Sequence, residues 1–271
     1  MPAPILPMTT DLDPAAVALA RLYDVDLLDD PGDLDLYLAL AQRAAGSILE
    51  LCVGSGRLAV PLAGAGWSVT GVDRDPAMLA RAMVRATNAG REVVRRLELI
   101  QSDILDLDSP DATHAGHRLA ILALNSIFLL GDRAAQAAVV RTLATQLAPG
   151  GIAVIDVWLP DADDLARYDG RIILEYARQD PESGRLVVKT ASAIHDAASQ
   201  TVTLTTIFDE GAPGQPPARW VRTDRLRLTG ADELRSLAEA AGLAVEVVAG
   251  DYGLAPLGPG SERAILVAVR P

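Results

Sequence analysis

The chain has 271 residues, half of them hydrophobic, which excludes a disordered protein. Its 36 acidic and 24 basic side chains give a formal net charge of −12, so we expect neither nucleic acid nor an anionic membrane surface as a partner. The single cysteine excludes an internal disulfide, and no metal site is expected. There is no uncharged apolar run long enough to span a membrane and no recognisable signal peptide, so we expect a cytoplasmic protein.

The first 46 residues are predicted to be a helical cap. Apolar residues follow helical spacing from residue 12, and Pro14 suits a first helical turn. The stretch Asp29-Asp30-Pro31-Gly32-Asp33 breaks this pattern, and a second helix is expected from Leu34 to Ala45.

Strand and helix patterns then alternate up to residue 160. The predicted strands are 47–52, 68–73, 97–101, 119–124 and 152–158, and the predicted helices are 58–65, 76–88 and 133–147. A last helix (231–241) and two strands (243–249 and 263–269) resume the pattern near the end. Short turns between alternating elements predict an α/β fold, with a doubly wound, Rossmann-like sheet formed by 47–160 and 229–271.

Residues 161–228 break the alternation. Four strands, at 172–178, 186–194, 201–208 and 220–228, follow one another without helices between them. This pattern predicts an antiparallel β-meander inserted into the α/β domain. The meander has two candidate roles, as a lid over a substrate or as a dimerisation surface, and 201–206 is interpreted as an exposed edge strand.

Polar residues gather where the predicted parallel strands end. Glu50 precedes the turn Gly54-Ser55-Gly56, and Asp73, Asp103 and Asn125 follow the next three strands. In open α/β sheets ligands bind at this edge, and a carboxylate at the end of the second strand is placed to accept from ribose hydroxyls.

A nicotinamide dinucleotide is an alternative ligand, because Gly54-x-Gly56-x-x-Ala59 satisfies the dinucleotide fingerprint. Three features count against it. Glu50 would repel a pyrophosphate, the second carboxylate at Asp103 suits an adenine amino group, and a meander replaces the second nucleotide-binding half.

Three motifs together resemble the class I S-adenosylmethionine-dependent methyltransferases, in particular their small-molecule branch (methyltransferase domain 25-like). They are Glu50-Leu51-Cys52-Val53-Gly54-Ser55-Gly56-Arg57, Gly71-Val72-Asp73-Arg74-Asp75-Pro76-Ala77-Met78-Leu79 and Leu147-Ala148-Pro149-Gly150-Gly151. The N-terminal Tyr23-Asp24 pair and Tyr37 match the helical segment of that branch. One departure is Cys52, which stands where the commonest pattern has the first glycine of the loop.

The resemblance implies S-adenosylmethionine as the cofactor and gives roles to individual residues. Glu50 and the backbone at Cys52 and Gly54 would hold the methionyl ammonium, and Asp73 would hold the ribose hydroxyls. The remaining implied contacts are Arg74 and Met78 flanking the adenine, Asp103 accepting from its amino group, the Ile104 amide reaching a ring nitrogen, the Asn125 carbonyl on the methionyl amine, and Tyr23 capping the carboxylate.

The acceptor is expected over the ends of the fourth and fifth strands. We expect four aromatic residues to line this region: Tyr37, Phe128, Trp158 and Tyr168. The catalytic residue is unknown, and we take as our hypothesis that the enzyme works by proximity without a dedicated base. His195 is a weak candidate base, Asp156 and Asp251 are weaker ones, and His114 and His117 are assigned to a surface loop before the fourth strand.

The predicted function is methyl transfer from S-adenosylmethionine to nitrogen or oxygen of a small molecule, of the kind found in specialised metabolism. One alternative is a repurposed methyltransferase fold that binds the cofactor without methylating, and a less favoured one is a nicotinamide-dependent oxidoreductase. A peptide terminus stays open as an acceptor, and a homodimer through the inserted sheet is one candidate assembly.

Overall fold

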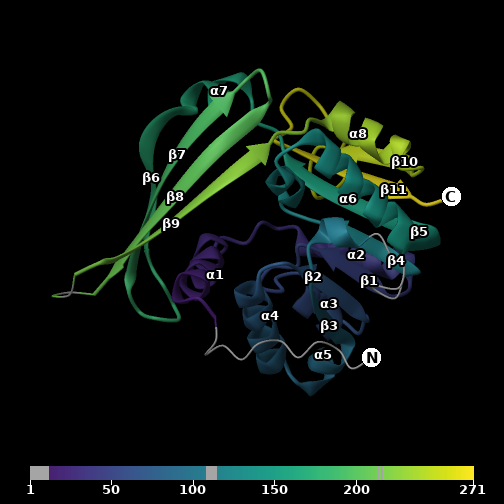
Figure 1. Cartoon of the computed structure of the whole chain (residues 1–271). Coiled ribbons are helices and arrows are strands. Elements are labelled where there is room, and N and C mark those ends of the chain that lie inside the picture. Colours follow the sequence, from purple (N-terminus) through teal and green to yellow (C-terminus); the bar gives the residue numbers. More distant parts are fainter. Residues whose placement is uncertain (1–11, 108–114, 213, 215) are drawn as a thin grey trace.

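Two β-sheets organise the computed structural model, which describes residues 12–107, 115–212, 214 and 216–271. The larger sheet has seven strands in the order β10-β11-β5-β4-β1-β2-β3 (Figure 1). Its strands are β1 (Ile48–Leu51), β2 (Val69–Asp73), β3 (Leu97–Gln101), β4 (His117–Leu122), β5 (Leu147–Trp158), β10 (Ala244–Ala249) and β11 (Arg263–Val269). The first five run parallel to one another, and β11 runs antiparallel between β5 and β10.

Helices cover both faces of this sheet, because alternate residues of a strand point to opposite sides. Ile48 of β1 packs with the apolar cluster that includes α2 (Leu34–Ala44), α3 (Ala59–Gly64), α4 (Pro76–Ala89) and α5 (Arg91–Arg96). Leu49 of the same strand packs with the cluster of α6 (Arg133–Gln146) and α8 (Ala231–Ala240). The doubly wound architecture predicted from the sequence is therefore confirmed.

Local chemistry sets the start of the helix after β2. Asp75 caps α4 by accepting from the Ala77 amide at 2.8 Å, and Pro76 occupies the first turn. Before that turn, a Cβ atom at Gly71 would lie 2.7 Å from Val53 Cγ2. Only glycine therefore lets β2 pass this close to the loop after β1.

The inserted residues form the second, antiparallel sheet, in the order β6-β7-β8-β9. Its strands are β6 (Asp169–Gln179), β7 (Leu186–Asp196), β8 (Thr201–Gly211) and β9 (Ala218–Arg227). The expectation that 201–206 is an edge strand is wrong. These residues belong to β8, which pairs with β7 on one side and β9 on the other, so the edges are β6 and β9.

Helix α1 (Pro14–Asp26) lies between the four-stranded sheet and α4 (Figure 1). Leu22 and Val25 pack against Val187 and Phe208 of the four-stranded sheet. On its other side, Ala20 packs with Met78 of α4. One short helix therefore connects the inserted sheet to α4 of the α/β domain.

Some elements differ from the prediction. Helices α5 and α7 (Ala162–Arg167) were missed, because six residues give too short a pattern to show helical periodicity. Strand β5 begins at Leu147, where it pairs with His117, although the glycines at 150 and 151 indicated a turn. His117 is the first residue of β4 and is buried, which corrects its assignment to a surface loop, and His114 lies outside the described residues.

Within the described part of the chain, the structure contains no helix that is both long enough and apolar enough to cross a bilayer.

Candidate functional site

Carboxylates meet at the C-terminal ends of β1, β2 and β3, which we call the cofactor edge. Asp73 ends β2, and its two oxygens accept from the Gly54 and Asp75 amides at 2.9 Å each. Burial raises the pKa of Asp73, although these two amides act to lower it. These two bonds fix the orientation of the carboxylate at the loop after β1. Its oxygens have further lone pairs that can accept hydrogen bonds from a ligand.

Glu50, near the end of β1, is buried beneath that loop. Its Oε2 atom has no hydrogen-bond partner within the described residues. Burial raises the pKa of Glu50 to about 8, and Asp33 and Asp73 add to the shift, whereas Arg57 opposes it. A buried acceptor without a partner costs free energy, so Glu50 is poised for a cationic or donor ligand.

Arg57 places a positive charge near Glu50, and Asp33 holds it there. Its two terminal nitrogens donate to the Asp33 carboxylate at 2.6 and 2.7 Å, and the Asp33 side chain is completely buried. The bidentate pair fixes the guanidinium at the entrance to α3, where it is close enough to Glu50 and Tyr23 to act on their pKa values.

Tyr23 on α1 covers the glycine loop. A Cβ atom built on Gly54 would lie 3.9 Å from the Tyr23 ring. Burial, together with Glu50, Asp24 and Asp73, raises the pKa of the Tyr23 hydroxyl to about 12, against the opposing effect of Arg57. The hydroxyl is therefore a neutral hydrogen-bond donor at neutral pH.

The other predicted cofactor residues border the same edge. Asp103 caps the short 3₁₀ helix Ile104–Asp106 by accepting from the Leu105 amide at 3.0 Å, and Ile104 is buried in the core. Arg74 is exposed, whereas Met78 is buried and packs near Tyr23. The structure brings all of these residues to the ends of β2 and β3, as expected from their positions in the sequence.

The loop after β1 also contains a strained residue. Cys52 has a φ of +57°, in the left-handed region that favours glycine. This explains why a glycine is common at this position in the motif that the sequence resembles. Burial raises the pKa of the Cys52 thiol to about 12, which disfavours the thiolate at neutral pH.

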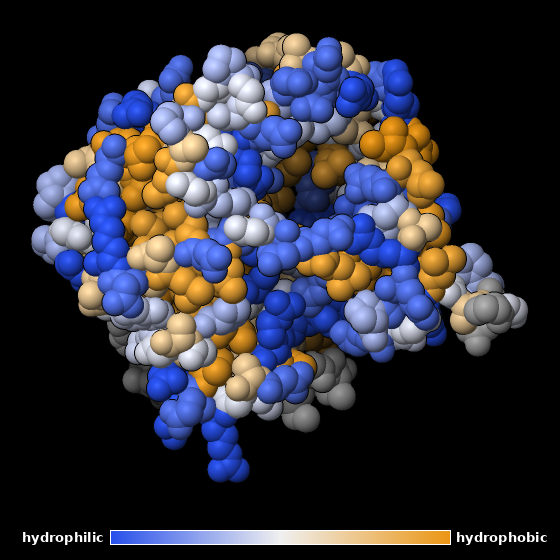
Figure 2. All heavy atoms as spheres, turned by 180° about the vertical axis from the view of Figure 1, so that it is seen from behind, coloured by the Kyte–Doolittle hydropathy of each residue, from blue (hydrophilic) through white to orange (hydrophobic). Residues whose placement is uncertain are grey.

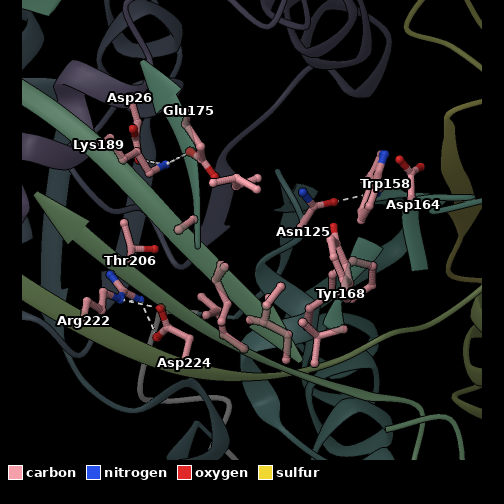
Figure 3. Close-up of a pocket in the computed structure, with 18 of the residues that line it drawn as sticks. Asp26, Asn125, Trp158, Asp164, Tyr168, Glu175, Lys189, Thr206, Arg222 and Asp224 are labelled. Atoms are coloured by element: carbon pink, nitrogen blue, oxygen red, sulfur yellow. Dashed lines mark hydrogen bonds and ion pairs between the residues drawn. The ribbon is translucent and has the colours of Figure 1, made fainter. Parts of the chain in front are cut away.

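Asn125 stands at the end of β4, with a φ of +62°. Its side-chain oxygen accepts from the Trp158 amide at the end of β5 (Figure 3), so this carbonyl is engaged within the protein. Asp156, a weaker candidate base, is completely buried and forms an ion pair with Arg263 at 3.1 Å. It also accepts from the Tyr252 hydroxyl at 2.9 Å, so we assign it a structural role.

A cavity of about 630 Å³ opens between the cofactor edge and the four-stranded sheet. Seen from behind, the molecule has a deep hollow at this place (Figure 2). Five residues predicted from the sequence line the cavity: Tyr23, Asn125, Phe128, Trp158 and Tyr168. Tyr23 also covers Gly54, so this one side chain borders both the glycine loop and the cavity.

Two charged groups line the side of the cavity formed by the inserted sheet (Figure 3). Lys189 on β7 forms ion pairs of 2.8 Å with Asp26 of α1 and with Glu175 of β6. Arg222 and Asp224 of β9 pair with each other at 2.7 Å. Both groups are internally neutralised to a large extent, so they restrict the cavity without giving it a strong net charge.

Three predicted residues lie elsewhere. Tyr37 on α2 is completely buried in the core and does not line the cavity, and its hydroxyl has no partner within the described residues. His195, the weak candidate base, lines a separate hollow of about 310 Å³ with Leu165 and Thr229. Asp251 is exposed and accepts from the Ala255 amide.

Comparison with known proteins agrees with this geometry. Residues 48–151 match the family model described as a methyltransferase domain. Among solved structures, the CcbJ methyltransferase from Streptomyces caelestis is 21% identical, with a TM-score of 0.69 over 96% of this chain and 97% of its own. An S-adenosylmethionine-dependent methyltransferase from Clostridium acetobutylicum ATCC 824 is 14% identical, with a TM-score of 0.74 over 93% of this chain and 97% of its own.

The sugar N-methyltransferase KedS8 from Streptoalloteichus sp ATCC 53650 is 22% identical, with a TM-score of 0.71 over 92% of this chain and 91% of its own. No curated protein matches the sequence. The chain has the class I S-adenosylmethionine-dependent methyltransferase fold. In this methyltransferase fold the cofactor edge corresponds to the matched segment, and the inserted sheet lies outside it.

Sequence reasoning missed the residues that hold α1 in place. Asp24 accepts from the Ser55 hydroxyl at 2.5 Å, from Arg81 at 2.7 Å and from Arg85 at 3.0 Å. Arg21 pairs with Asp180 and Glu210, the two buried carboxylates of the inserted sheet. The Tyr23-Asp24 motif drew attention to Asp24. The neighbouring sequence did not indicate the partners of Asp24 and Arg21, which lie 31 to 189 residues away.

Proposed function

We propose that the protein transfers a methyl group from S-adenosylmethionine to nitrogen or oxygen of a small molecule bound under the four-stranded sheet. The observation that carries this proposal is the unpartnered, buried Glu50 Oε2 beside the glycine loop, on the same edge as the Asp73 carboxylate. This pair of acceptors fits the cofactor, because the methionyl ammonium needs an acceptor and the ribose needs a carboxylate for its hydroxyls.

Individual side chains divide the binding of the cofactor. Glu50 accepts from the methionyl ammonium, and the Asp73 carboxylate accepts from the ribose hydroxyls. Tyr23 donates to the methionyl carboxylate and closes the loop at Gly54, where its ring lies 3.9 Å from the position of a Cβ atom. Asp103 and the Ile104 amide bind the adenine.

S-adenosylmethionine supplies an electrophilic methyl group on a good, neutral leaving group. The protein therefore contributes mainly alignment and exclusion of water. Tyr23, Asn125 and Trp158 frame the opening from the cofactor edge into the cavity, and Phe128 and the inserted sheet exclude water from the acceptor. No base is assigned, in line with transfer by proximity to an acceptor that is already nucleophilic.

Related solved structures support an acceptor of this size class. KedS8 is described as a sugar N-methyltransferase, and CalS10, which is 19% identical with a TM-score of 0.66, is described as an amino pentose methyltransferase bound to the cofactor. The cavity of about 630 Å³ holds a molecule of drug size, so the proposed acceptor comes from specialised metabolism.

The inserted sheet also offers a surface for a second copy of the chain. Its outer face exposes Ile172, Leu174, Ile194 and Val221, each with more than half of its surface accessible. An apolar sheet face of this kind supports a homodimer through the inserted sheet. Light scattering should give a dimer mass for the wild type and a monomer mass for Leu174→Asp.

Isothermal titration with S-adenosylmethionine and NAD separately tests the proposal. We expect micromolar binding of the first and none of the second, followed by release of S-adenosylhomocysteine when an acceptor is present. Binding of NAD alone would identify an oxidoreductase. Binding of S-adenosylmethionine without turnover across acceptor libraries would identify the repurposed fold.

A further inference from the structure

We propose that the acceptor is an amine carried on an apolar body, with its nitrogen held by Trp158, Tyr168 and the nearby carboxylate of Asp164. This inference rests on the proposed function, because it names the substrate class of that reaction. It concerns the end of the cavity next to Asn125, where the ends of β4 and β5 meet α7 (Figure 3).

Two aromatic rings form one corner of the cavity. Trp158 ends β5 and Tyr168 follows α7, and their ring centroids lie 6.4 Å apart with the planes tilted by 46°. Both side chains line the cavity, so a ligand bound at this corner can contact both rings. The face of a tryptophan ring is the side-chain surface that attracts an organic cation most strongly.

A carboxylate also lies at this corner. Asp164 of α7 lines the cavity, and after burial it is the largest cause that raises the pKa of the Tyr168 hydroxyl. Glu175 of β6 lines the cavity as well, but it is paired with Lys189 at 2.8 Å. Neither arginine near this corner holds Asp164 closely. Arg167 lies 3.9 Å from Asp164 with 72% of its side chain exposed, and Arg171 is held by Asp169 at 2.5 Å.

The wall beyond this corner is apolar. On the inner face of the four-stranded sheet, Ala193 is paired with Leu204 and Val202 with Leu226, so these side chains form one continuous patch. Leu124 and Phe128 line the opposite wall. Hydroxyl groups placed against these surfaces would lose water without gaining hydrogen bonds, which disfavours a bare sugar and favours an apolar body.

The chemistry of transfer agrees with a site for a cation. The lone pair of the neutral amine forms a C–N bond to the methyl carbon as the S–C bond breaks, and the sulfur leaves as a neutral thioether. The positive charge thus moves from sulfur to nitrogen, and the new ammonium then releases a proton to solvent. The two rings and the Asp164 carboxylate stabilise charge at the nitrogen as it develops.

The test is calorimetric binding of three probes to the protein saturated with S-adenosylhomocysteine. The probes are 4-phenylbutylamine, the isosteric 4-phenylbutan-1-ol and glucosamine. We expect the aryl amine to bind at least tenfold more tightly than either of the other two. Asp164→Asn should reduce the advantage of the amine over the alcohol at least threefold. Asp163→Asn, which removes an exposed charge on the same helix, should leave it unchanged.

A second variant covers the case in which Asp164→Asn unfolds, because Asp164 belongs to the capping box of α7. Trp158→Leu should weaken binding of the amine at least fivefold and binding of the alcohol less than twofold. Equal binding of amine and alcohol, equal or tighter binding of glucosamine, or no binding of any probe would overturn the proposal. Failure of S-adenosylhomocysteine itself to bind would instead contradict the proposed function, so the two failures are distinguishable.

Discussion

The cofactor edge and the cavity under the inserted sheet are built in different ways. At the cofactor edge, Asp73 and Gly54 lie 19 residues apart and are joined directly by a hydrogen bond that fixes the turn. Around the cavity, the fixing contacts run from α1 to the inserted sheet, as in the pair of Arg21 and Glu210, 189 residues apart. Local turns therefore orient the residues of the cofactor edge, whereas long-range ion pairs position the inserted sheet over the cavity.

This difference has a consequence for dynamics and for specificity. A loop held by backbone amides keeps its shape when distant residues change. A sheet held over a cavity by a few charged pairs can shift or vary in sequence without disturbing the cofactor edge. We expect variants of the two regions to act separately on cofactor binding and on lid stability.

The largest expected effect is on the inserted sheet. Arg21→Ala removes the cation that Asp180 and Glu210 share, and these carboxylates are only 1% and 4% exposed. The half-exposed Arg185, 3.7 Å from Glu210, remains as a weaker partner of one of them. Breaking such a pair should destabilise the protein by about 3–5 kcal/mol in urea unfolding. Arg219→Ala, which removes an exposed pair with Asp209, should cost less than about 1 kcal/mol. Equal losses in the two variants would contradict the role given to Arg21.

The next effect is on cofactor affinity. Asp73→Asn should weaken S-adenosylmethionine binding about a hundredfold in calorimetry, because two charge-assisted hydrogen bonds are weakened and each contributes about 1.5–3 kcal/mol. Asp106→Asn, which removes an exposed carboxylate beyond β3, is the matched control and should bind as the wild type does. A change below threefold in Asp73→Asn would show that the ribose binds elsewhere.

Cofactor binding should also depend on pH. The pKa of Glu50 in the free protein is raised to about 8, chiefly by burial, so the side chain is protonated at lower pH. Binding an ammonium group favours the carboxylate, so the proton must leave on binding. Affinity should therefore increase about tenfold per pH unit from pH 6 to 8 and level off above that. Glu50→Gln should bind more weakly and show a flat profile, whereas a flat wild-type profile would contradict the assignment.

The smallest expected effect concerns His195. It lines the smaller hollow beside Leu165 and does not line the acceptor cavity. Turnover of His195→Ala should stay within about threefold of the wild type, at unchanged cofactor affinity. A loss of about a thousandfold would match removal of a general base and would end the hypothesis of transfer by proximity.

The sequence predicted the parts of the fold that rest on local pattern. Asp73 and Asp103 could be placed at one edge because parallel strands end together, and the motif around Gly54 marked the loop. Tyr37 was different, because its match to a family segment said nothing about the direction of its side chain, which is buried. The prediction that residues 201–206 form an edge strand was wrong, because the alternation of apolar and polar residues does not reveal the order of strands within a sheet.

Ion pairs such as Lys189 with Asp26 could not be predicted, since 163 residues separate them and neither stands in a motif. The corner formed by Trp158 and Tyr168 was predicted only in part. Both residues were expected near the acceptor, but their tilt and the Asp164 carboxylate near them depend on how α7 packs, and α7 itself was missed.

The most direct test of the account is a crystal structure with S-adenosylhomocysteine bound. The account predicts the ribose hydroxyls on Asp73, the amino group on Glu50, and the sulfur facing the cavity between Tyr23 and Asn125. A cofactor bound away from Asp73, or a sulfur directed away from the cavity under the inserted sheet, would contradict it.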